Sequence, residues 1–86
     1  MVENSVRVSF FFDPSAVAML VQTASKFQSR ISLVQDEKTA NAKSIMGIIS
    51  LNMQEGETIK IVAEGSDAAA AASELEAFFK GMNGPE

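Results

Sequence analysis

The sequence contains no histidine and no cysteine in its 86 residues. Without cysteine the chain has no disulfide and no thiolate metal site. Without histidine it also lacks the commonest metal ligand and the commonest general base. No convergent set of carboxylates stands out along the chain either. We therefore expect a protein that is not an enzyme and that holds no cofactor and no metal.

Positive charge is scarce, with 7 Lys and Arg against 11 Asp and Glu and a formal net charge of −4. The basic residues are scattered singly, so no basic stripe exists to follow a nucleic-acid backbone. No apolar run approaches the roughly 20 residues of a membrane helix, and the N-terminus has no signal-peptide pattern. We expect a cytoplasmic protein that binds neither nucleic acid nor membranes, folded as one domain over residues 1–86.

Hydrophobic periodicity predicts a strand followed by a helix in the first third of the chain. Val2, Val6, Val8 and Phe10 alternate with polar residues, as in a half-buried strand. Continuing the alternation places Phe12 inward and Phe11 outward. Asp13-Pro14 is a typical N-cap and first helical residue. The helix is predicted from Pro14 to about Phe27, with this inner stripe: Val17, Leu20, Val21, Ala24 and Phe27.

The rest of the chain predicts three more strands and two more helices. The strands are expected around Ile31 and Leu33, over Thr39 to Lys43 and over Thr58 to Glu64; the helices run from Ser44 or Ile45 to about Asn52, and from Ala68 to a stripe ending at Phe78, Phe79 and Met82. Gly65-Ser66-Asp67 is predicted as a turn and cap for the last helix, which Gly81, Gly84 and Pro85 end. The order β-α-β-β-α-β-α predicts an α+β fold, a four-stranded antiparallel sheet with three helices on one face.

Ser44 lies between a strand-like segment and a short helical pattern. A serine at this position caps a helix by accepting a hydrogen bond from an unpaired backbone N–H. The same position suits a phosphate, because the unpaired N–H groups favour negative charge. Both interpretations stay open from the residues alone.

The short helix carries more apolar side chains than a helix on a sheet can bury. Ile48 and Leu51 are predicted to face the core. Ile45, Met46 and Ile49 lie on the other side and are predicted to stay exposed. An exposed apolar cluster of this kind indicates a partner-binding surface, and methionine adapts its shape to a partner.

Two segments resemble a known family. Lys43-Ser44-Ile45-Met46-Gly47, with Leu51 following, resembles the regulatory serine segment of HPr, the small phosphocarrier of the bacterial sugar phosphotransferase system. Leu20-Val21-Gln22-Thr23-Ala24-Ser25-Lys26-Phe27 resembles its first helix. The resemblance runs from Val6 to about Phe79 and implies the HPr-like open-faced β-sandwich.

The resemblance also implies a function for Ser44. In HPr-like proteins of many Gram-positive bacteria the matching serine is phosphorylated by a bifunctional HPr kinase/phosphorylase. Phosphoserine and the patch of Ile45, Met46 and Ile49 are then expected to dock on a LacI-type catabolite repressor. Lys43 is expected to shape the local field or to contact the kinase. This is the pattern of the branch of the family in carbon catabolite repression that lacks the histidine and keeps the serine.

The chain departs from the family at the phosphocarrier site. HPr carries its phosphate on the histidine of a His-Ala-Arg-Pro-Ala motif, and Asp13-Pro14-Ser15-Ala16-Val17 stands there instead. A histidine phosphocarrier is excluded. Asp13 has three interpretations: a helix cap, a permanent charge imitating phosphohistidine, or an acyl-phosphate acceptor. Ser15 replaces the arginine that in the family holds phosphate and partners. Enzyme I and sugar-transport components are therefore expected to bind only weakly, and binding to the catabolite repressor is expected to be less tight than in family members that keep the arginine.

Two questions remain open from the sequence. Phe11, which replaces the usual glycine, either makes a new contact or folds over the helix end. The apolar patch serves either phosphorylation-dependent regulation or a phosphorylation-independent binding module, an HPr competitor or adaptor.

Overall fold

The computed structural model describes residues 1–81 of the chain. Its strands are β1 (Val2–Arg7), β2 (Arg30–Gln35), β3 (Lys38–Asn41) and β4 (Thr58–Glu64), and its helices are α1 (Pro14–Ser25), α2 (Ile45–Leu51) and α3 (Ala68–Phe79). This is the predicted order of elements. The predicted contact of Met82 and the predicted stop signals Gly84 and Pro85 lie outside the described residues.

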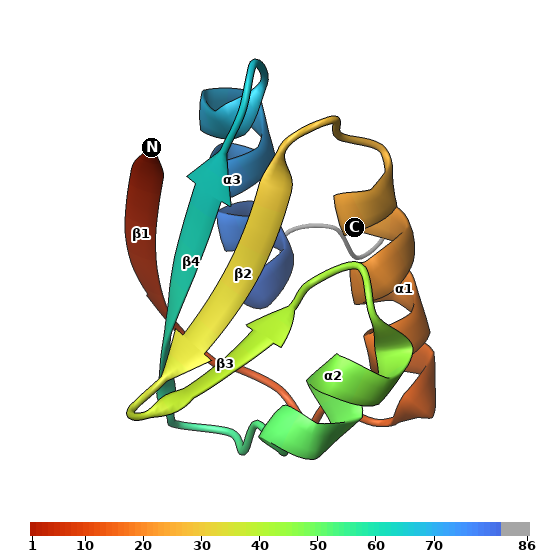
Figure 1. Cartoon of the computed structure of the whole chain (residues 1–86). Helices are drawn as coiled ribbons and strands as arrows, with labels where there is room; N and C mark the ends of the chain where they lie inside the picture. Colours follow the sequence, from red (N-terminus) through yellow and green to blue (C-terminus); the bar gives the residue numbers. More distant parts are fainter. Residues whose placement is uncertain (82–86) are drawn as a thin grey trace.

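The four strands form one antiparallel sheet in the order β1-β4-β2-β3. β4 is therefore central although it comes last in the chain, and it pairs with β1 on one side and β2 on the other. Figure 1 shows the strands in front, α3 behind them, and α1 and α2 at one side. The α+β prediction of a four-stranded antiparallel sheet with three helices is confirmed.

The core lies between the sheet and the helices. β4 alternates as predicted, with Ile59, Ile61 and Ala63 fully buried. The inner stripe of α3 is alanine-rich near its start and aromatic near its end, and all of its described members are buried: Ala68, Ala71, Ala72, Leu75, Phe78 and Phe79. The small residues let α3 approach the sheet closely, and the large ones fill the far end of the layer.

The first strand is shorter than the alternation predicted, because β1 ends at Arg7. Beyond it, Val8 keeps its backbone paired with the loop before β4: its N–H donates to the carbonyl of Glu57 at 2.8 Å, and its carbonyl accepts from Gly56 at 2.7 Å. Val8 is also fully buried. The alternation therefore predicted the burial of Val8 correctly but did not predict where the strand β1 ends.

Three consecutive phenylalanines follow and divide as the alternation predicted. Phe10 and Phe12 stack with ring centroids 5.1 Å apart. Phe12 also packs against Phe79 of α3, with the two ring centroids 5.5 Å apart. Phe11 points away and is 74% exposed. The two anchored rings fix the backbone on each side of the exposed one.

Two boundaries differ from prediction. α1 ends at Ser25 rather than near Phe27, and the N–H of Phe27 donates to the carbonyl of Ala24 in a closing turn, 3.2 Å away. β3 ends at Asn41 rather than at Lys43, because the side chain of Asn41 accepts from the Lys43 N–H at 2.8 Å and bends the chain toward α2.

The hairpin between β2 and β3 turns through Asp36, whose φ is 54°. Among the described residues Asp36 and Asn52 are the non-glycine residues with positive φ. A type I′ turn needs positive φ at both central residues. The second central residue, Glu37, lacks it, in line with the prediction that a turn without glycine disfavours this type.

The prediction that Asp67 caps α3 is confirmed for its position in the chain but not for its side chain. Asp67 stands at the N-cap position, but its side chain makes no capping hydrogen bond. Its carboxylate instead accepts from the backbone N–H groups of Gln28 and Ser29, both at 2.9 Å, and from the Ser29 hydroxyl. These bonds join the loop after α1 to the loop before α3. The Ser29 hydroxyl, followed by the Gln28 N–H, holds the pKa of Asp67 below its ordinary value of 3.8.

Candidate functional site

Ser44 is the N-cap of α2. Its backbone is extended, with φ −115° and ψ 116°, and its Oγ accepts from the N–H of Gly47 at 3.1 Å. The prediction that Ser44 caps the short helix is confirmed. Ser44 is half-buried, and its hydroxyl lies at the border between the end of β3 and the exposed side of α2.

α2 divides into a buried and an exposed side. Ile48 and Leu51 are 1% and 3% exposed. On the opposite side the side chains of the apolar patch, defined as Ile45, Met46 and Ile49, are 49%, 76% and 56% exposed. The predicted burial and the predicted exposure are both confirmed. The short helix thus presents its patch directly after the Ser44 cap.

Lys43 precedes the cap but does not point freely into solvent. It is half-buried, and its Nζ donates to the backbone carbonyl of Phe27 at 2.7 Å. The bond joins the loop after α1 to the segment that enters α2. The ammonium group of Lys43 therefore stabilises the segment directly before Ser44.

Asp13 caps α1, the first of its three interpretations. Its Oδ1 accepts from the N–H of Ala16 at 2.8 Å, and its carbonyl accepts from the N–H of Val17 at 3.0 Å. Ser15 lies exposed in the first turn of the same helix. Over residues 1–81 no group of three or more Asp, Glu, His or Cys side chains is arranged to hold a metal ion.

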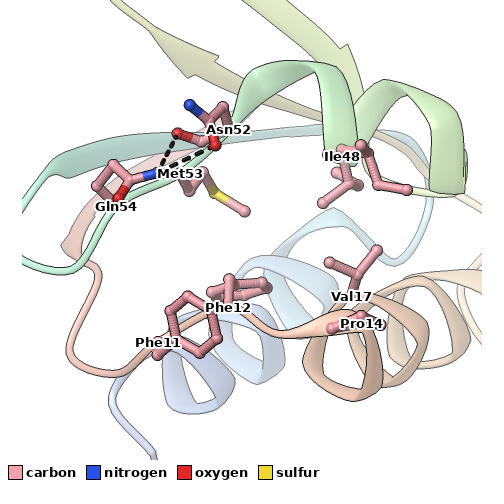
Figure 2. A pocket seen from close by; sticks show the side chains of 9 residues that line it. Phe11, Phe12, Pro14, Val17, Ile48, Asn52, Met53 and Gln54 are labelled. Carbon is pink, nitrogen blue, oxygen red and sulfur yellow. Dashed lines mark hydrogen bonds between the residues drawn. The ribbon is translucent and has the colours of Figure 1, made fainter.

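Phe11 does not fold over the helix end. It forms one wall of a groove of about 320 Å³ between the start of α1 and the end of α2. Figure 2 shows Phe11, Phe12, Pro14 and Val17 on one side of the groove and Ile48, Asn52, Met53 and Gln54 on the other. Ile49 of the apolar patch also lines it. The patch and the groove are therefore one continuous apolar surface.

The end of α2 was missed as part of this surface. Asn52 closes the helix in the left-handed conformation, with φ 53°. The chain then turns so that Met53 is buried while Gln54 stays exposed, and the amide of Gln54 donates to Asn52 Oδ1 at 3.0 Å. An asparagine directly after an apolar helix was the available signal.

Within the part of the chain that the structure describes, no helix is long and apolar enough to cross a membrane.

Fold and site together define a small open-faced β-sandwich with a capped serine beside an exposed apolar patch. A family model described as "PTS HPr component phosphorylation site" matches residues 14–81. The chain is 42% identical over 82 residues to the HPr-like protein Crh of Halalkalibacterium halodurans, covering 93% of this chain and 98% of that protein. It is 44% identical over 63 residues to the phosphocarrier protein HPr of Treponema pallidum, covering 73% and 72%.

Solved structures agree. HPr-C-His from Thermoanaerobacter tengcongensis superposes with a TM-score of 0.93 at 39% identity, covering 100% of this chain and 99% of that one. The chain belongs to the HPr family and resembles its Crh members. Family members are phosphocarrier or regulatory proteins of the phosphotransferase system and of carbon catabolite repression, and are not themselves enzymes. The HPr-like fold predicted from the sequence is confirmed.

Proposed function

We propose that this chain is a regulatory member of the HPr family whose Ser44 is phosphorylated by an HPr kinase/phosphorylase. Phosphoserine and the apolar patch then dock on a LacI-type catabolite repressor. The chain does not act as a histidine phosphocarrier, because it has no histidine. It is a substrate of the kinase and a messenger to the repressor.

One observation carries this proposal: Ser44 is the N-cap of the helix whose exposed side carries three apolar side chains, of which Met46 is 76% exposed. Phosphorylation would add about −1.5 to −2 charge and new acceptor oxygens beside that patch. Within residues 1–81, the side chain of Ser44 accepts its hydrogen bond from the local N–H of Gly47. A phosphate there changes the surface without breaking a long-range contact, so the fold is expected to stay the same.

The kinase reaction tests the first step. Purified HPr kinase/phosphorylase with ATP is expected to add one phosphate, located on Ser44 by mass spectrometry. Ser44→Ala is expected to abolish the product. Ser50→Ala, which removes another serine of α2 that is exposed, is the matched control and is expected to leave the product unchanged. Wild-type protein that gains no phosphate on Ser44 contradicts the proposal.

Binding to a purified LacI-type repressor tests the second step. Phosphorylated protein is expected to bind more tightly than unmodified protein. Met46→Glu is expected to weaken that binding while leaving the melting temperature nearly unchanged. Met19→Glu changes a methionine of α1 that is 50% exposed and serves as the control. Unchanged binding by Met46→Glu contradicts docking through the patch.

A second candidate function has its own support. The apolar patch and the adjoining groove are formed without any phosphate. The chain therefore also suits a phosphorylation-independent binding module, an HPr competitor or adaptor. Equal binding of a partner by unmodified wild type and by Ser44→Ala favours this candidate over the first.

Asp13 as a phosphate acceptor or as a phosphohistidine mimic stays a separate question. Incubation with enzyme I and phosphoenolpyruvate addresses the acceptor. A phosphate label that disappears in Asp13→Ala but persists in Ser44→Ala would show that Asp13 accepts it. The cap bond from Ala16 to Asp13 is the function that its geometry supports best.

A further inference from the structure

The groove between Phe11 and Gln54 is small and apolar. Its volume of about 320 Å³ lies at the bottom of the roughly 300–1,000 Å³ range of ligand pockets, and its lining is mostly apolar. A groove of this size suits one large apolar side chain. The occupant that fits is a residue presented by a protein segment.

Charge further defines the occupant. The lining residues of one wall fall within residues 11–17 and those of the other within residues 48–54, and neither stretch contains a lysine or an arginine. The charged residue within these stretches is Asp13, and Glu55 directly follows the second stretch. Asp13 lies between two lining residues of one wall, and the exposed Glu55 follows a lining residue of the other. The rim of the groove is therefore acidic on both sides.

Two alternative occupants fit poorly. A second copy of this chain would bring one acid-rimmed groove against another, and like charges facing each other across an interface are unfavourable. A nucleic acid would bring phosphates toward the same carboxylates. A segment with lysine or arginine beside its apolar side chain satisfies both the groove and its rim.

We propose that the groove between Phe11 and Ile49 binds a basic protein segment, which inserts one large apolar side chain while its flanking Lys or Arg residues pair with Asp13 and Glu55. The binding does not require phosphate on Ser44. It rests on the proposed function only in using the same side of α2. Phe11 is the residue that distinguishes this site, because it supplies the exposed aromatic wall, 74% exposed.

The first experiment identifies the preferred sequence without assuming a partner. A random dodecapeptide display library is selected against the unphosphorylated full-length protein. We expect enriched peptides with a Leu, Ile, Phe or Met flanked by Lys or Arg. Enrichment of neutral or acidic peptides would overturn the proposal, and so would the absence of any peptide above background.

The second experiment places the binding in the groove. For the best peptide, Phe11→Ser and Ile49→Ser are each expected to weaken affinity at least about tenfold in calorimetry. Both side chains are exposed, so both variants are expected to fold, and their melting temperatures check this. Met19→Ser, at a half-exposed methionine that does not line the groove, is the matched control and is expected to bind normally.

Charge is tested separately. Asp13→Asn and Glu55→Gln are each expected to weaken binding about two- to threefold and to reduce its salt dependence, as for partly exposed ion pairs. A peptide with Gln in place of its Lys and Arg is expected to bind more weakly to wild type. Affinity that is indifferent to Phe11→Ser, or a peptide complex held together by two copies of the chain in sedimentation, would overturn the proposal. The kinase is absent throughout, so these results are independent of whether Ser44 is phosphorylated.

Discussion

Two regions of the molecule use their side chains in opposite ways. At the end of the sheet where α1 runs into β2 and β4 into α3, at the top of Figure 1, Asp67 accepts from two backbone N–H groups and a hydroxyl in the neighbouring loop. Along α2, by contrast, the side chain of Ser44 caps the first turn of its own helix, and the apolar side chains that follow it are left exposed. The Asp67 end of the sheet fastens loops together, and α2 leaves a surface for a partner.

The largest expected effect concerns the boundary of that surface. Ile48→Ala removes a side chain that is 1% exposed and is expected to destabilise the fold by about 2–5 kcal/mol. Ile49→Ala, one residue further and 56% exposed, is expected to cost less than about 1 kcal/mol. Urea unfolding followed by circular dichroism measures both. Similar losses would mean that α2 has no free side.

Gly65→Ala tests the fastened end. Gly65 has φ 147°, and a Cβ there would lie 2.7 Å from the Cα of Ser29. Because the obstacle is a backbone atom, we expect the free energy of unfolding to fall by about 2 kcal/mol or more, from strain and overpacking together. Gly56→Ala is the control, since Gly56 also has positive φ but open space around its would-be Cβ. Equal losses in thermal unfolding would show that the close approach to Ser29 contributes nothing.

Ser44→Ala tests how much the regulatory serine contributes to stability. Losing the bond from Gly47 is expected to cost about 1 kcal/mol, the usual cost of removing an N-cap. Chemical denaturation of unphosphorylated protein gives the value, and Ser50→Ala is expected to change it far less. A loss several times larger would mean that Ser44 holds more than the start of α2.

The smallest effect is the pH dependence at Asp67. Its folded pKa lies below its ordinary value, so its contribution to stability is fully present at neutral pH and is lost as pH falls through that depressed pKa. Asp67→Asn is therefore expected to be less stable than wild type at pH 7, with a gap that narrows below about pH 4. A gap that is constant with pH would exclude a contribution from the charge.

The fold was predictable because its signals are local and agree with one another. Alternation in β4, the Asp13-Pro14 start of α1 and the apolar content of α2 each require a buried face, and only a two-layer arrangement satisfies all of them. The two sides of α2 were also predictable, since a helix of two turns on a sheet cannot bury Ile45, Met46 and Ile49 together with Ile48 and Leu51.

What the sequence did not predict depends on contacts between distant segments. Asp67 fits a helix cap by position, yet its partners Gln28 and Ser29 lie almost forty residues earlier and no local pattern reveals them. Likewise the amine of Lys43 reaches the carbonyl of Phe27, which sequence spacing does not indicate. The groove was missed for the same reason, since its two walls meet only after the chain has folded.

The stacked pair Phe10 and Phe12 also affects how much conformational entropy is lost when a partner binds in the groove. Phe11 stands on a backbone held on both sides by those half-buried rings, and its own side chain has only two rotatable bonds. A partner therefore meets a preorganised wall and loses little conformational entropy in ordering it. Because the groove is apolar, binding of a partner in it is expected to give a negative heat-capacity change in calorimetry. This change is expected to be smaller when the Phe11 side chain is removed.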